Sequence, residues 1–212
     1  MKSSDKPTTQ LCTHDTESIT VRGADLVNDL IGELTFTEMT YFTITGRRPT
    51  RAQTRILDAV LVTLMEHGLT PSAIATRMIY GSTPESLQAA VSAGLLAVGS
   101  VFVGTMEGCA ALIERILAAP DRQAAARDIA DEYRSERKAI PGFGHHMHKP
   151  DDPRTPKLFA IAEAEGVPGM HIDALRTLSA AVDARFGKHL TINATGAIRS
   201  EEHTSELQSQ FR

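Results

Sequence analysis

The residues best suited to chemistry are gathered in one short segment, residues 140–154, which reads I-P-G-F-G-H-H-M-H-K-P-D-D-P-R. Proline and glycine occur throughout this segment, so it cannot form a regular helix and is expected to be a loop. Its imidazoles exchange protons near neutral pH, and its lysine and arginine can bind carboxylate or phosphate groups. The segment therefore suits chemistry on an anionic substrate.

Three roles are open to the histidines of this loop. They could ligate zinc or copper, but His145, His146 and His148 lack helical spacing and cysteine partners. They could also be solvated loop side chains with no function. The interpretation that we favour is acid–base work by His145, with Lys149 as a point charge for phosphate and Arg154 as a carboxylate ligand.

A fourth histidine, His67, follows Glu66 and precedes Gly68 at the predicted end of an amphipathic helix. The helix dipole would favour its protonated form there. A histidine at a helix end is more often a cap than a ligand, so the sequence pattern alone gives His67 a structural role first and a binding role second.

The composition is that of an ordinary globular chain. Its 212 residues are 42% hydrophobic and 23% charged, with a net charge of −4, which allows one good-sized core and does not suggest nucleic-acid binding. Cys12 and Cys109 lie far apart without CxxC spacing, so we expect plain thiols. The polar N-terminus lacks the apolar core of a signal peptide and no run approaches a membrane span, so we expect a cytoplasmic protein without membrane contact.

Apolar periodicity and capping signals predict helices along almost the whole chain, so the expected fold class is all-α. Capping boxes begin helices at Thr35 and Thr50, and Thr70 caps a third helix with proline next to it. The only β-prone run, residues 19–21, allows one short strand. Helices are predicted over residues 24–34, 84–98 and 121–138, and in segments that end at Gly46, Gly68, Tyr80, Pro120, Gly166 and Gly187.

Two of these helices carry opposite expectations about burial. Residues 84–98 are dense in Ala, Ser and Gly, which permit close helix packing, so we expect this helix at the centre of the fold. Residues 121–138 carry charges on most sides, and only Ile129 and Tyr133 look firmly buried, so we expect this helix at the surface.

The C-terminal residues 199–212 do not continue the apolar period that precedes them. They look like the in-frame translation of a sequencing-library adapter, with a natural polar tail as the alternative, and we exclude them from the fold prediction. If the adapter interpretation holds, the natural protein continues beyond Ile198. We would then expect the 212-residue form to be inactive or poorly folded.

Several segments resemble landmarks of the citrate synthase superfamily, in the order in which the family has them. The P-G-F-G-H run at 141–145, followed by D-P-R at 152–154, resembles the P-G-[YF]-G-H…D-P-R signature. Residues 67–73 resemble the substrate-binding histidine segment, 104–107 the H-G-G-A-x-E turn and 193–196 the N-V-D segment. The variant most resembled is the short citryl-CoA lyase group, related to the C-terminal module of ATP-citrate lyase.

The resemblance implies an all-helical fold with a large and a small domain that closes over its substrates and is usually dimeric. The polar N-terminal segment would span residues 1–18, the large domain 19–118 and the small domain 119–188. The chain would return to the large domain at 189–198, before the non-native tail at 199–212.

The resemblance also implies roles for single residues. His145 would polarise the carbonyl of oxaloacetate or exchange a proton with the citryl hydroxyl, and Arg154 would bind a substrate carboxylate. His67 would hydrogen-bond the same substrate, and Lys149 would lie near a phosphate of coenzyme A. No metal or tightly bound cofactor is implied, because coenzyme A enters as the thioester substrate.

Two departures from the family pattern direct the functional prediction. Phe102 replaces the histidine of the synthases, as in the lyase module, and Thr195 replaces the catalytic aspartate and cannot act as a carboxylate base. We therefore predict cleavage of citryl-CoA to acetyl-CoA and oxaloacetate, with the enolate stabilised by backbone N–H groups or by the Thr195 hydroxyl. The alternatives are a citrate or 2-methylcitrate synthase-like condensing enzyme and a non-catalytic acyl-CoA or dicarboxylate binding homologue.

Overall fold

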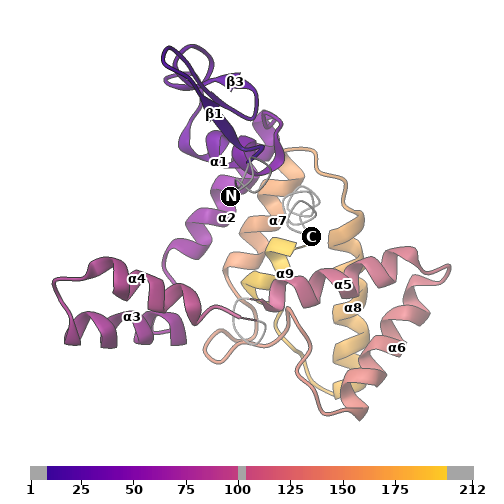
Figure 1. The fold of residues 1–212 in the computed structure, drawn as a ribbon. Coiled ribbons are helices and arrows are strands. Elements are labelled where there is room, and N and C mark those ends of the chain that lie inside the picture. Colours follow the sequence, from indigo (N-terminus) through magenta and orange to yellow (C-terminus); the bar gives the residue numbers. More distant parts are fainter. Residues whose placement is uncertain (1–8, 100–103, 200–212) are drawn as a thin grey trace, which may run out of the picture. The chain divides into compact units, whose positions relative to one another are not determined.

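The structure is a computed structural model that describes residues 9–99 and 104–199. Phe102 and the tail from residue 200 onward lie outside the described residues. Helices make up most of the described chain and confirm the all-α fold class (Figure 1). The described residues form two compact units, 9–58 in one and 59–199 in the other, with the gap at 100–103. The division into a large and a small domain stays a prediction.

The first unit begins with a small antiparallel sheet in the order β1-β2-β3. Its strands are β1 (Cys12–His14), β2 (Ile19–Val21) and β3 (Ala24–Asp25). The predicted single strand is therefore one of three, and the predicted helix over residues 24–34 is wrong. Only one π-helical turn, η2 (Leu26–Leu30), forms there, because Gly23 and Gly32 both take the left-handed backbone conformation and bend the chain on either side.

Local capping chemistry sets where the next two helices begin, as predicted. The Thr35 hydroxyl accepts from the Glu38 N–H while the Glu38 carboxylate accepts from the Thr35 N–H, and α1 (Phe36–Thr45) then ends at the left-handed Gly46. Thr50 and Gln53 make the same reciprocal pair before α2 (Arg51–Met65). Because α2 ends at Met65, His67 lies in the loop that follows it.

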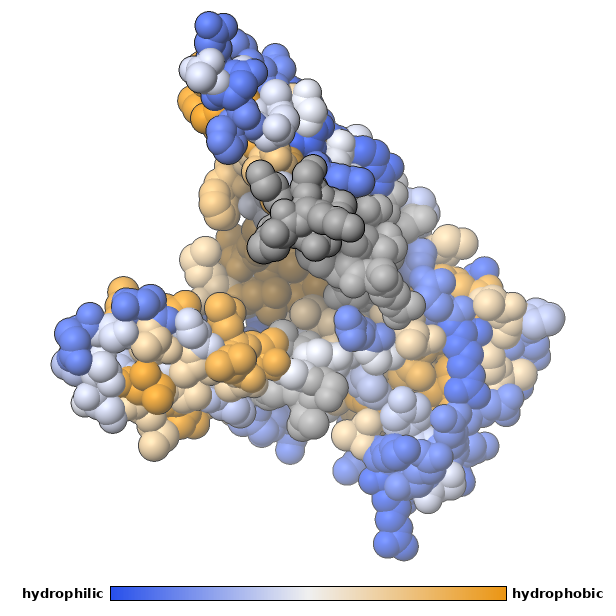
Figure 2. Space-filling model, in the orientation of Figure 1, coloured by the Kyte–Doolittle hydropathy of each residue, from blue (hydrophilic) through white to orange (hydrophobic). Residues whose placement is uncertain are grey.

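Two helices, α3 (Pro71–Ser82) and α4 (Leu87–Leu96), pack against each other as a hairpin (Figure 1). The expected close approach is present, since a Cβ on Gly94 would lie 2.2 Å from the Thr76 Oγ1. The expected central position of α4 is wrong, because only the side with Ala90 and Gly94 is covered while Leu87 and Leu95 are exposed. Figure 2 shows apolar side chains on the surface of this hairpin.

The core of the second unit lies between α5 (Thr105–Ala118), α6 (Arg122–Ser135) and α8 (Met170–Phe186). Helix α6 lies at the surface, as predicted, and buries Ala126, Ile129 and Ala130 in this core. Tyr133, expected to be firmly buried, is only partly buried against it. The largest fully buried side chains of this core include Ile113, Ile116, Ile129, Leu175, Leu178 and Val182. No helix in the described ranges is long and apolar enough to cross a membrane, and the cytoplasmic location stays a prediction.

The histidine-rich loop is anchored on this core. Ile140 and Phe143 belong to the buried cluster, and Phe143 forms an antiparallel bridge with Ile192. The loop leads into α7 (Arg154–Ala164), and the chain later returns beside it in α9 (Ala194–Arg199). Gly142 and Gly196 make the return possible, because a Cβ on Gly196 would lie 2.6 Å from the Gly142 carbonyl oxygen.

Candidate active site

The segment before α9 runs along the histidine loop and holds it by backbone hydrogen bonds. The Gly144 N–H donates to the Thr191 carbonyl at 2.7 Å, and the Asn193 N–H donates to the Gly142 carbonyl at 3.0 Å. The side-chain amide of Asn193 also donates to the Gly144 carbonyl at 3.0 Å. These bonds fix the backbone directly before His145, so a loop rich in proline and glycine still presents its side chains in a defined place.

The buried carboxylate of Asp152 links the loop to both neighbouring helices. It is fully buried and accepts from the Arg154 N–H at 3.0 Å, from the Arg154 Nε and Nη2 at 2.9 and 2.7 Å, and from the Ala194 N–H at 3.1 Å. Burial by itself raises the pKa of a carboxyl group, but the bonds from Arg154 and Ala194 outweigh it, so the pKa of Asp152 lies below its ordinary value.

This pairing aims Arg154 at two histidines. With its Nε edge bound to Asp152, the guanidinium places Nη2 3.4 Å from the His145 Nε2 and Nη1 3.4 Å from the His67 Nδ1. Three of the residues that the sequence singled out, separated by up to 87 positions, therefore meet at one point. A cation between two imidazoles suits an anionic ligand with hydrogen-bonding oxygens.

The ring of His145 is held in one tautomer by the loop backbone. Its Nδ1 accepts from the N–H groups of Met147 at 3.1 Å and His148 at 3.0 Å, so the proton of the neutral ring is at Nε2. Burial, together with the neighbouring His148, lowers the pKa of His145 below its ordinary value. His145 therefore presents a neutral Nε2–H, and its 3.4 Å contact with the Arg154 Nη2 is then between two donors, which an acceptor oxygen of a ligand between them would satisfy.

The two histidines that received no role in the sequence prediction contact this ring. His146 stacks on His145 with 4.8 Å between ring centroids, and His148 lies at 4.4 Å. They add to the surroundings that keep His145 neutral. Within residues 9–99 and 104–199, no three His, Cys, Asp or Glu side chains are arranged to hold a metal ion.

Thr195, at the position expected for the catalytic aspartate, belongs to a short chain of polar groups. Its hydroxyl donates to the Asn193 side-chain oxygen at 2.6 Å, and the Thr105 hydroxyl lies 3.5 Å from it. Thr105 begins α5 in the segment that resembles the H-G-G-A-x-E turn. The single hydroxyl proton of Thr195 is thus engaged with Asn193, and the group can donate to a ligand only if this bond is exchanged.

Lys149 lines a pocket of about 460 Å³ that also includes His145, Lys188 and His189. The sequence prediction included Lys149 and missed Lys188 and His189, which follow the end of α8 at Gly187. Two lysines and two histidines in one pocket favour an anion, and only the fold brings them together. Neither the distance along the chain nor the local pattern shows that the two lysines share a pocket.

Comparisons with known proteins identify the family of the chain. The family model for the citrate synthase C-terminal domain matches residues 22–195, and the chain therefore belongs to the citrate synthase family. The solved structure of citryl-CoA lyase from Hydrogenobacter thermophilus is 34% identical with a TM-score of 0.81, covering 94% of this chain and 76% of that one. The superfamily resemblance of the motifs is confirmed.

More distant relatives share the fold or part of the sequence. ATP citrate lyase from Methanothrix soehngenii, solved with citrate and coenzyme A, is 20% identical with a TM-score of 0.80, covering 97% of this chain and 33% of that one. Probable ATP-citrate synthase subunit 1 of Neurospora crassa is 31% identical over 99 residues, 47% of this chain and 14% of the relative. Putative citrate synthase 2 of Mycobacterium tuberculosis is 31% identical over 133 residues, 59% of this chain and 35% of the relative. The chain thus spans about a third or less of these curated relatives.

Replacing Asp152 with alanine should destabilise the protein by about 3–5 kcal/mol at pH 7, because it leaves the partly buried Arg154 cation without its partner. The contribution of Asp152 to the free energy of unfolding is present above the pKa of the group in the unfolded chain, about 3.9. It is lost as the pH falls through the lower pKa of the group in the folded protein. The difference in stability between the wild type and Asp152→Ala should therefore persist at pH 5 and become smaller only in stronger acid.

Chemical denaturation of the wild type and of Asp152→Ala across this pH range measures the difference in stability. The exposed Asp128 on α6 is the matched control, and its alanine variant should unfold like the wild type. Equal stability of Asp152→Ala and Asp128→Ala would contradict the role assigned to the buried carboxylate.

Proposed function

We propose that this chain carries the chemistry of citryl-CoA cleavage, yielding acetyl-CoA and oxaloacetate. The observation that supports it is the Arg154 guanidinium, held by Asp152 and placed 3.4 Å from both His145 and His67. The similarity to a citryl-CoA lyase over 94% of this chain agrees with this choice.

The geometry suits a 2-oxo or 2-hydroxy carboxylate at Arg154. The guanidinium binds a substrate carboxylate through its Nη atoms, and His67 adds a hydrogen bond to the same group. The neighbouring oxygen, a ketone in oxaloacetate and a tertiary hydroxyl in citryl-CoA, then lies at the His145 Nε2. Asp152 positions the Arg154 guanidinium for the first of these contacts.

Cleavage breaks the bond between the tertiary carbon and the methylene of the thioester arm. The hydroxyl loses its proton and becomes the ketone of oxaloacetate, while the electron pair passes to the thioester as an enolate that is then protonated to acetyl-CoA. His145 accepts the hydroxyl proton at Nε2 once its own proton has moved to Nδ1, which gives up the bonds from the Met147 and His148 N–H groups. The tautomer in the structure, with the proton already at Nε2, is the one that hydrogen-bonds the ketone product.

The same tautomer gives a specific reason to consider the reverse direction. In a condensation, the Nε2–H of His145 polarises the ketone of oxaloacetate at once, as a citrate or 2-methylcitrate synthase-like enzyme requires. Condensation also needs a base to form the acyl-CoA enolate, and Thr195 cannot supply it. Because of that threonine we place cleavage first, with the Thr195 hydroxyl as an oxyanion donor.

Coenzyme A is the substrate carrier in this proposal and no cofactor is held permanently. Lys149 and Lys188 line the pocket beside His145 and provide the positive charge for a phosphate of the coenzyme. Oxaloacetate, acetyl-CoA and citryl-CoA are therefore the small-molecule partners that we propose.

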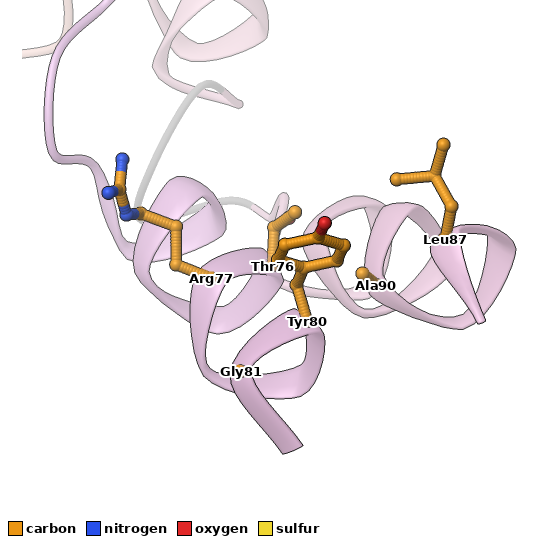
Figure 3. A pocket seen from close by; sticks show the side chains of 6 residues that line it. All are labelled: Thr76, Arg77, Tyr80, Gly81, Leu87 and Ala90. Atoms are coloured by element: carbon orange, nitrogen blue, oxygen red, sulfur yellow. The ribbon is translucent and has the colours of Figure 1, made fainter. Parts of the chain in front are cut away.

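A second copy of the chain is the protein partner that we propose, covering the α3–α4 hairpin. A pocket of about 380 Å³ on this hairpin is lined by Thr76, Arg77, Tyr80, Gly81, Leu87 and Ala90 (Figure 3). Helix α4 carries no charged residue, and Leu87, Val91 and Leu95 are exposed at helical spacing on one side. Such a face is typical of an interface between identical chains, as the family resemblance implies.

Alanine at position 145 should lower acetyl-CoA release from citryl-CoA by about 10²–10⁴-fold, the usual contribution of a positioned acid or base. The assay is run on the 212-residue chain, with His14→Ala, at an exposed histidine of the first unit, as the control. Wild-type rates in His145→Ala would exclude the proposed role. Turnover by the 212-residue wild type would overturn the expectation that this form is inactive.

Substrate tests separate the alternatives. Thiol release from oxaloacetate with acetyl-CoA or propionyl-CoA, without citryl-CoA cleavage, would favour the condensing enzyme. Calorimetric binding without turnover, with activity restored by Thr195→Asp, would favour the non-catalytic binding homologue.

Glutamate at position 95 should convert a dimer to a monomer, because it would bury a charge within the apolar α4 face. Sedimentation velocity on the wild type and on Leu95→Glu measures the mass. Ile31→Glu, at an equally exposed apolar residue of the first unit, is the control and should remain dimeric. A monomeric wild type, or a dimer that persists in Leu95→Glu, would refute the assignment of this face.

A further inference from the structure

His189, in the segment between α8 and α9, bridges two carboxylates. Its Nδ1 is 2.5 Å from the Asp183 Oδ2 in the last turn of α8, and its Nε2 is 3.0 Å from the Asp151 Oδ1 in the histidine loop. The second oxygen of Asp183 accepts from the Leu190 N–H at 2.8 Å. One imidazole therefore connects the end of α8 to the loop that carries His145 and Lys149.

This bridge requires a protonated ring. A neutral imidazole has a single N–H, so it donates to one carboxylate and turns a lone pair toward the other. Two carboxylate contacts on opposite ring nitrogens are both favourable only for the imidazolium form. The hydrogen bonds to Asp183 and then to Asp151 raise the pKa of His189 above its ordinary value.

The charged groups around this ring are of both signs. Asp183 on α8 and Asp151 on the loop favour the imidazolium, while Lys188 and Lys149, which line the same pocket, oppose it. The Thr191 hydroxyl donates to the Pro150 carbonyl and is a further, uncharged connection between the two segments. Protonation of His189 thus changes one contact of the loop and leaves its uncharged connection in place.

We propose that His189 is a positioning residue whose imidazolium form fastens the Asp151 end of the histidine loop to α8, and thereby shapes the Lys149–Lys188 pocket for the phosphate groups of coenzyme A. The identity of this ligand rests on the proposed function. The fastening contact is present below the ordinary histidine pKa of about 6.5 and is lost as the pH rises through the higher pKa of the folded protein. Binding in the pocket should therefore weaken toward alkaline pH.

The first arm of the test needs no ligand. Histidine side-chain NMR on the full chain should give His189 a titration midpoint above about 6.5, and Asp151→Asn should lower that midpoint. A wild-type midpoint at or below this value, or a midpoint that Asp151→Asn does not change, would overturn the inference whatever reaction the chain catalyses.

The second arm uses coenzyme A as the probe in calorimetry at pH 6 and pH 8. Wild-type affinity should fall by about twofold to fivefold at the higher pH, the range expected for one exposed ion pair. The 3′-phosphate of coenzyme A itself gains charge between pH 6 and pH 8, so the wild type has to be compared with variants. His189→Gln should lose the fall in affinity, and the control His14→Gln should keep it. An identical pH response in wild type and His189→Gln would overturn the positioning role. Absence of binding in all proteins, with a raised midpoint in the first arm, would uphold the contact and overturn both coenzyme A as the ligand and the proposed function.

Discussion

The buried carboxylate of Asp152 is the group on which the candidate site depends. It accepts hydrogen bonds from the backbone and guanidinium of Arg154 and from the first residue of α9. A buried carboxylate is tolerated only when it is paired and hydrogen-bonded, so the loop, α7 and α9 have to meet around it. The same pairing leaves the Nη atoms of Arg154 directed at His145 and His67.

The surroundings shift the pKa values of two histidines of the same region in opposite directions. Backbone donors, burial and neighbouring imidazoles keep His145 neutral with its proton at Nε2. Two carboxylates favour the imidazolium of His189. The two histidines have complementary roles in our proposal. His145 contacts a substrate oxygen beside Arg154, and His189 holds the loop that presents His145.

The sequence predicted where helices begin when capping residues next to the helix set the first turn. The capping boxes at Thr35 and Thr50 and the proline after Thr70 are where α1, α2 and α3 begin. The apolar periodicity over residues 24–34 predicted a helix that does not form, because the backbone bends at Gly23 and Gly32. For α4, the density of small residues predicted close helix packing, which is present against α3, but the predicted central position is wrong because Leu87 and Leu95 are exposed.

The site was predicted in part, because the order of short motifs brought His67, His145 and Arg154 together through the family resemblance. Its finer features depend on contacts between distant segments. The tautomer of His145 is set by two backbone N–H groups, and the bridge at His189 joins residues 38 positions apart along the chain. No spacing rule in the sequence reports either contact.

The central claim is that His145 is a neutral Nε2–H donor held beside Arg154, and nitrogen NMR of the histidine side chains tests it most directly. With His145→Gln to assign the signal, we expect a neutral ring protonated at Nε2 at pH 7 and a pKa below the ordinary value of about 6.5. A charged ring at pH 7, or a neutral ring protonated at Nδ1, would contradict it.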